Sequence, residues 1–88
     1  MSVNILGEEY QIATTTTLDL SFNSLTEMPE SVFLLTNLQY LYLQYNKLTR
    51  LPESVGSLSN LEYLDISNNN LTSFPESIGS LSNLKYLD

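Results

Sequence analysis

The residues in this sequence that could catalyse a reaction are mainly aspartates and serines. Asp19 and Asp65 each stand two residues before a serine, Ser21 or Ser67. If the two aspartates lie two strands apart in one sheet, their carboxylates are roughly 10 Å apart, a separation that would suit an inverting glycoside hydrolase. Such chemistry also requires burial to shift a carboxyl pKa, and a serine nucleophile requires a base. An open strand surface offers no such burial, and the chain has no His to act as the base, so we expect no enzymatic activity.

The composition also argues against metal and cofactor chemistry. The chain has no Cys and no His, which removes disulfides, thiolate nucleophiles, zinc sites of the Cys/His type and imidazole acid–base catalysis. The aspartates do not follow the spacing of a calcium-binding loop. We therefore expect neither a metal nor another cofactor.

Charge and hydropathy limit the kinds of partner and the location. Ten acidic and three basic residues give a net charge of −7, which disfavours nucleic acid and anionic membrane surfaces and favours a basic or neutral partner. No segment approaches the about 20 apolar residues of a membrane span. The start, MSVNILGEEY, lacks the pattern of a signal peptide. Together with the absence of cysteine, this predicts an intracellular, cytoplasmic protein.

The sequence contains an internal repeat, and the structure that this repeat forms must position any functional site. Asn23, Asn46 and Asn69 are 23 residues apart, and residues 38–60 and 61–83 are identical at 14 of 23 positions. Proline recurs with the same period. The second copy shows the repeated positions best: Leu38, Leu41, Leu43, Asn46, Leu48, Leu51, Pro52, Val55, Leu58 and Asn60. A fixed period of this length is typical of a solenoid.

This pattern, LxxLxLxxNxL followed by LPxSV/I and LxN, resembles the leucine-rich repeat family over residues 15–88. Its second half resembles the intracellular subclass with 22–24 residues per repeat that is found in scaffold proteins. The resemblance implies an α/β solenoid and a non-enzymatic module that binds proteins or peptides. In longer members the activity often lies in attached domains.

The residues themselves predict the same elements. Alternation at Leu41-Tyr42-Leu43 predicts a short strand with its leucines inward, and equivalent strands stack into a parallel sheet on the concave face. Each proline fits the first position of a 3₁₀ turn on the convex face, and Gly56 and Gly79 disfavour a full α-helix. We expect Asn23, Asn46 and Asn69 to form a structural ladder that satisfies the loop backbone.

The division of the chain follows from the period. Residues 1–14 are expected to form a β-hairpin cap with a loop over residues 6–9. Repeats are expected at 15–37, 38–60 and 61–83, and a truncated fourth begins at 84–88. Phe33 and Leu34 replace the Gly-Ser of later copies and are expected to pack against the cap. At the other end, Leu81, Leu84 and Leu87 are expected to lack a cover.

The outward strand positions vary between copies and therefore carry the information for binding. Five of the six tyrosines are outward, and the usual LDLSxN of the family becomes LYLQYN in the second copy. Asp19, Asp65 and Asp88 add negative charge. Tyrosines are common in binding hot spots, although neighbouring tyrosines can also simply support one another on a sheet. The candidate partner-binding residues are Phe22, Tyr40, Tyr42, Gln44, Tyr45, Tyr63, Asp65 and Tyr86.

Two other interpretations of function stay open. The chain could be a structural or assembly unit, either a fragment of a longer repeat array or a unit that self-associates through its uncapped C-terminal repeat. The high identity between copies also fits a designed or trimmed repeat protein.

Overall fold

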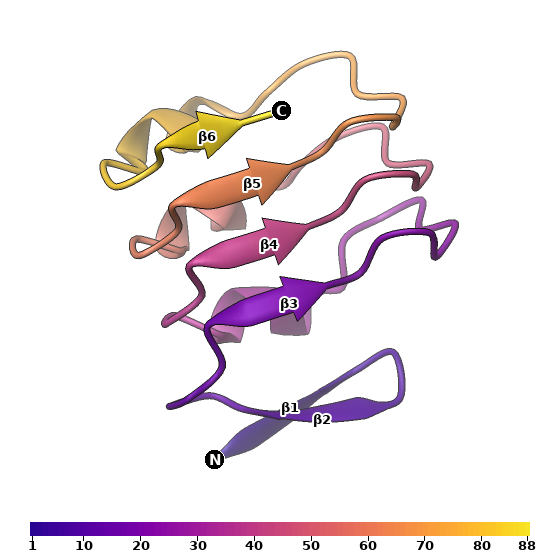
Figure 1. The fold of residues 1–88 in the computed structure, drawn as a ribbon. Helices are drawn as coiled ribbons and strands as arrows, with labels where there is room; N and C mark the ends of the chain where they lie inside the picture. The colour runs from indigo at the N-terminus through magenta and orange to yellow at the C-terminus, as the bar shows by residue number, and fades with distance from the viewer.

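Four short parallel strands form one sheet, which a stack of similar turns builds one strand at a time (Figure 1). The computed structural model describes all of residues 1–88. The strands are β3 (Thr17–Asp19), β4 (Tyr40–Tyr42), β5 (Tyr63–Asp65) and β6 (Tyr86–Leu87), in that order across the sheet. The expected α/β leucine-rich-repeat solenoid is therefore confirmed.

The register of the sheet lines up the equivalent leucines of the repeats. Leu41 pairs with Leu18 on one side and Leu64 on the other, and Leu64 pairs with Leu87. Leu18, Leu41 and Leu64 are buried, because side chains alternate along a strand and these point into the interior. The residues directly before and after each leucine in its strand consequently face outward. The tyrosines of β4, β5 and β6 occupy such positions.

Three 3₁₀ segments lie on the other side of the sheet, one per repeat (Figure 1). They are η1 (Glu30–Leu34), η2 (Glu53–Ser57) and η3 (Glu76–Ser80). The expectation of 3₁₀ turns is confirmed, but the prolines differ from it: Pro29, Pro52 and Pro75 precede the segments in extended conformation. The fixed φ of proline suits both conformations, so the sequence alone did not separate them.

An antiparallel hairpin of β1 (Ser2–Ile5) and β2 (Glu8–Gln11) covers the first repeat (Figure 1). Its turn is Leu6-Gly7, with φ of 52° and 90°, so β2 begins at Glu8 and the loop is shorter than expected. Two central residues with positive φ match the twist of a tight hairpin. Ile5 is buried in the main core, and Ser31 Oγ donates to the Asn4 carbonyl at 3.3 Å.

Two expectations about the ends of the core are wrong. Leu34 is 55% exposed, and only Phe33 is buried, because a 3₁₀ turn directs adjacent side chains to different sides. Leu81 is buried in the same apolar cluster as Leu58 and Leu61, so its burial does not need a complete fourth repeat. Leu84 is half-buried, and Leu87 is exposed as expected. No helix has the length and apolar character that crossing a membrane requires.

Candidate functional site

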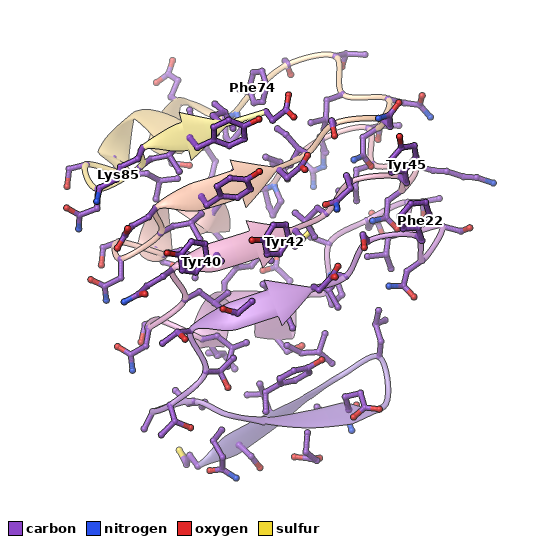
Figure 2. All side chains as sticks on the ribbon, viewed as in Figure 1. Phe22, Tyr40, Tyr42, Tyr45, Phe74 and Lys85 are labelled. Carbon is purple, nitrogen blue, oxygen red and sulfur yellow. The ribbon has the colours of Figure 1, made fainter.

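Four tyrosines gather on the outer face of the sheet around Tyr63. The ring centroid of Tyr63 lies 4.4 Å from that of Tyr86, 5.3 Å from Tyr42 and 6.3 Å from Tyr40. The Tyr63 and Tyr86 rings are stacked, at 12° between their planes, and the other two pairs are tilted. Figure 2 shows Tyr40 and Tyr42 standing out from β4. These four residues are called the tyrosine cluster below.

The repeat period and the strand geometry together build this cluster. Tyr40 pairs with Tyr63 across β4 and β5, and Tyr63 pairs with Tyr86 across β5 and β6. Side chains in register on one face lie close enough to touch. Tyr40 and Tyr86 are exposed, whereas Tyr42 and Tyr63 are half-buried. The cluster therefore offers partly solvated, mutually supported rings.

Carboxylates stand on both sides of Tyr42. Its register partners are Asp19 on β3 and Asp65 on β5. Oδ1 of Asp19 accepts from the backbone N–H and the hydroxyl of Ser21, at 2.9 and 2.6 Å. Oδ1 of Asp65 accepts in the same way from Ser67, at 3.0 and 2.7 Å. Each serine thus holds the carboxylate of its aspartate in one orientation.

The second repeat replaces this Asp–Ser pair by Tyr42 and Gln44. The Oε1 atom of Gln44 is buried and accepts no hydrogen bond in the structure. Tyr42 fills the place of an aspartate with a ring that contacts Tyr63. The second copy consequently adds aromatic surface where its neighbours carry charge.

Phe22 and Tyr45 form a second aromatic group, set apart from the tyrosine cluster at the loops that follow β3 and β4 (Figure 2). Their rings are stacked, with centroids 4.6 Å apart and planes at 9°. Phe22 is 70% exposed and Tyr45 50%. Their φ angles are 58° and 59°, in the left-handed region that costs a bulky residue energy. Asn68, at the equivalent position of the third repeat, has φ 57°.

The three ladder asparagines make backbone hydrogen bonds beneath these loops. Asn46 is buried and bonds to both its own repeat and the preceding one. Asn69 bonds in the same way to Leu43 and Leu48. Asn23 bonds only within its own repeat through its side chain. A second set, the last residue of each repeat, bonds to the preceding segment of the chain: Asn37, Asn60 and Asn83 donate to carbonyls 24 residues earlier, those of Ala13, Thr36 and Ser59.

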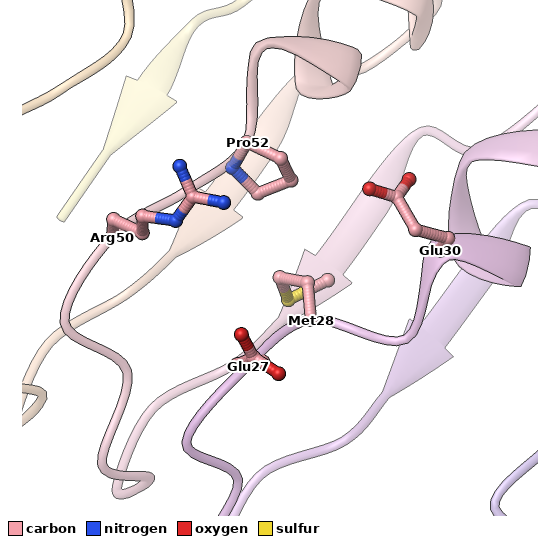
Figure 3. A pocket seen from close by; sticks show the side chains of 5 residues that line it. All are labelled: Glu27, Met28, Glu30, Arg50 and Pro52. Carbon is pink, nitrogen blue, oxygen red and sulfur yellow. The ribbon is translucent and has the colours of Figure 1, made fainter.

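A shallow hollow lies away from the sheet face, and sequence reasoning missed it. It is lined by Glu27, Met28, Glu30, Arg50 and Pro52 (Figure 3). Arg50 makes no ion pair there within 4.0 Å, since the one ion pair of the chain joins Lys85 and Glu62 at 3.4 Å. No group of three or more Asp or Glu side chains is placed to hold a metal ion. The hollow contains no nucleophile paired with a base.

Comparison with known proteins agrees with the repeat architecture. The family model described as "Leucine-rich repeat region" matches residues 35–88, and the "Leucine Rich Repeat" model matches residues 14–35. A solved structure, the leucine-rich-repeat protein LIC12759 of Leptospira interrogans, is similar with 42% identity and a TM-score of 0.81. That match covers 83% of this chain and 19% of the other, so the chain spans about a fifth of the length of that protein. None of the curated proteins compared with the chain matches it.

Members of this family are generally non-enzymatic modules that typically bind proteins. The match over residues 35–88 covers more than half of the chain, and the observed strands recur every 23 residues. The chain belongs to the leucine-rich repeat proteins.

Proposed function

We propose that this chain is a module that binds a protein or peptide on the outer face of its sheet. The observation that supports it best is the tyrosine cluster, in which Tyr63 has three other tyrosine rings within 6.3 Å on a solvent-facing surface. Tyrosine supplies large contact area with few rotatable bonds, and its hydroxyl can orient a partner. Rings that already support one another lose little further freedom on binding.

The contact surface is proposed to centre on Tyr42 and Tyr63. Gln44 follows Tyr42 by two residues and carries a buried amide oxygen that accepts no hydrogen bond from the chain, and Asp65 adds a carboxylate. Phe22 and Tyr45 extend the surface toward the loops. Exposed aromatic residues held by a costly backbone conformation are a reason to expect function, since folding alone would favour asparagine or glycine there.

A binding experiment with matched variants tests the proposal. The immobilised chain is compared with a variant carrying Tyr42→Ser and Tyr63→Ser, and retained proteins are identified by mass spectrometry. The control is Leu34→Ser, which removes an exposed apolar side chain from η1 on the other side of the sheet. Proteins lost with the tyrosine variant and kept with the control would support the proposal. Equal retention by all three chains would contradict it.

The same variants show whether the tyrosines bind a partner or only stabilise one another on the sheet. If the tyrosines only stabilise the sheet, the double variant lowers the free energy of unfolding but keeps its partners at temperatures where it is folded. Circular dichroism of each variant at the binding temperature shows whether it is folded, so that lost binding can be assigned to the surface.

A second candidate function is self-association through the C-terminal end. Strand β6 pairs only with β5, and Leu87 and Phe74 are 44% and 53% exposed, although the equivalent Leu64 and Leu51 are buried. An unpaired strand edge beside apolar side chains is a surface on which another chain can pair. The net charge of −7 opposes contact between copies, so association should strengthen with salt.

Light scattering over a range of protein and salt concentrations tests this second function. A mass that rises with concentration in the parent chain and stays monomeric in Leu87→Lys would support it. A monomer under all of these conditions would exclude it.

A further inference from the structure

We infer that the tyrosine cluster receives an arginine side chain of its partner, with the guanidinium lying on Tyr42 between Asp19 and Asp65. This inference rests on the proposed function, since it specifies the partner of the same surface. It comes from one arrangement: an aromatic ring on β4 with a carboxylate in register on each neighbouring strand.

The spacing of neighbouring strands suits a single planar cation on Tyr42. Neighbouring strands are about 4.8 Å apart, so a group on Tyr42 has a carboxylate within one strand spacing on each side. In both aspartates Oδ1 is occupied by a serine, at 2.6–3.0 Å, and Oδ2 receives no hydrogen bond from the chain. The serines thereby hold the carboxylates in place and leave one acceptor of each available.

The chain does not neutralise these carboxylates itself. It has three basic residues, and only Lys85 is ion-paired, to Glu62. Lys47 and Arg50 lie in the segment that follows β4 and make no ion pair with either aspartate. Both carboxylates are therefore free to pair with a positive charge of another molecule.

The geometry favours arginine over lysine. A guanidinium is planar, stacks on aromatic faces, and directs its N–H donors outward in its own plane, toward acceptors on opposite sides. An ammonium is a compact and strongly hydrated charge that gains less from such a ring. The other tyrosines of the cluster can cover the apolar stem of the arginine.

The probes for this inference are three short peptides that differ at one residue: acetyl-Ser-Gly-Arg-Gly-Ser-amide and the same peptide with citrulline or lysine in place of arginine. Citrulline keeps the planar shape and removes the charge. Each peptide is titrated into the full chain while NMR follows the ring signals of Tyr42 and Tyr63. Since cation–π attraction and partly exposed ion pairs each contribute modestly, we expect the arginine peptide to bind about fivefold more tightly than either of the others.

A matched pair of variants tests the role of the carboxylates. Asp19→Asn with Asp65→Asn keeps an oxygen that can accept from Ser21 and Ser67 while removing both charges. It should weaken the arginine peptide about fivefold and leave the citrulline peptide unchanged. The control, Glu76→Gln on η3, removes an exposed charge away from the sheet face and should change neither.

Several outcomes would overturn the inference. Equal binding of the arginine and citrulline peptides, equal binding of arginine and lysine, or no shift at Tyr42 with the arginine peptide would each do so. The proposed function fails on a different result, namely retention of the same partners after Tyr42→Ser and Tyr63→Ser. A surface that loses partners in that experiment but does not prefer arginine is a binding surface for another chemistry.

Discussion

Asn46 and Asn69 take equivalent places in successive repeats, and each side chain joins its own repeat to the preceding one. Asn46 Oδ1 accepts from the backbone N–H of Asn23 and Leu25 at 3.0 and 2.9 Å, and its Nδ2 donates to the carbonyls of Leu20 and Leu43 at 3.0 and 2.9 Å. Asn69 Nδ2 donates to the carbonyls of Leu43 and Ile66 at 2.9 and 3.1 Å. The ladder therefore connects turns of the coil as well as closing each loop.

We expect the cost of removing a ladder asparagine to depend on how many repeats it joins. Asn46→Ala should lower the free energy of unfolding by about 2–4 kcal/mol, because it leaves backbone donors and acceptors without partners beneath the loops. Asn23→Ala should cost less than about 1 kcal/mol, since Asn23 is exposed and its side chain bonds only within its own repeat. Urea unfolding measures both. Similar costs at the two positions would show that the inter-repeat bonds add nothing.

The two glycines of the 3₁₀ segments should respond differently to alanine. A Cβ at Gly56 would lie 2.7 Å from Cβ of Ser77, which belongs to the next repeat, whereas a Cβ at Gly79 would meet nothing within 4 Å. Gly56→Ala should therefore cost about 1–3 kcal/mol of unfolding free energy through overpacking. Gly79→Ala should be neutral or raise stability by less than about 1 kcal/mol, because alanine loses less chain entropy on folding.

Thermal unfolding of both alanine variants checks this difference. The two sites have the same local sequence, E-S-V/I-G-S, so each is the natural control for the other. If Gly56→Ala were as stable as Gly79→Ala, this result would contradict the close packing of η2 against η3.

The sequence predicted most of the fold because each repeated position has the same neighbours one period away. The strands, the 3₁₀ segments and the inward leucines follow from the 23-residue period. Leu34 and Leu81 were misassigned because they lie near the ends, where the neighbours change and periodicity no longer decides burial.

The candidate surface was less predictable than the fold. The sequence indicated which tyrosines are outward, but how their rings divide into the cluster and the Phe22–Tyr45 pair depends on side-chain packing in three dimensions. Two features of the sequence did indicate local geometry at this surface. Asn68 marks a position that tolerates left-handed φ, and the Asp-x-Ser spacing at Asp19 and Asp65 is typical of a turn in which the aspartate accepts from the backbone two residues on.

The Phe22–Tyr45 pair should show energetic coupling in a double-mutant cycle. Replacing either residue by Asn relieves left-handed strain of about 1 kcal/mol but removes a stacked ring pair of similar value, so each single variant should be nearly neutral. The double variant relieves the strain twice and loses the stack once. It should therefore be more stable than the parent chain by about 1 kcal/mol, as measured by urea unfolding. Strictly additive effects would show that the two rings do not support each other.

Tyr86 should hold its phenolic proton to a higher pH than a tyrosine free in water does. The Asp88 carboxylate, whose Oδ2 accepts from the Tyr86 hydroxyl at 3.3 Å, opposes the phenolate form and raises the pKa of Tyr86 above its usual value of 10.0, with a smaller contribution from Tyr63. In the unfolded chain this phenol ionises at its usual pKa. The folded chain thus holds more protons above that pH, and its stability falls as the pH rises through the pKa of Tyr86.

An absorbance titration at alkaline pH, with Tyr86→Phe to assign the step, measures this effect. Asp88→Asn removes the charge but keeps an acceptor for the hydroxyl, so it should lower the pKa of Tyr86. Asp65→Asn removes an equal charge from the same sheet face without a bond to Tyr86, and it should change that pKa less. If Asp65→Asn and Asp88→Asn lowered the pKa equally, the general negative potential of the face would be the cause, and the local contact between Tyr86 and Asp88 would not.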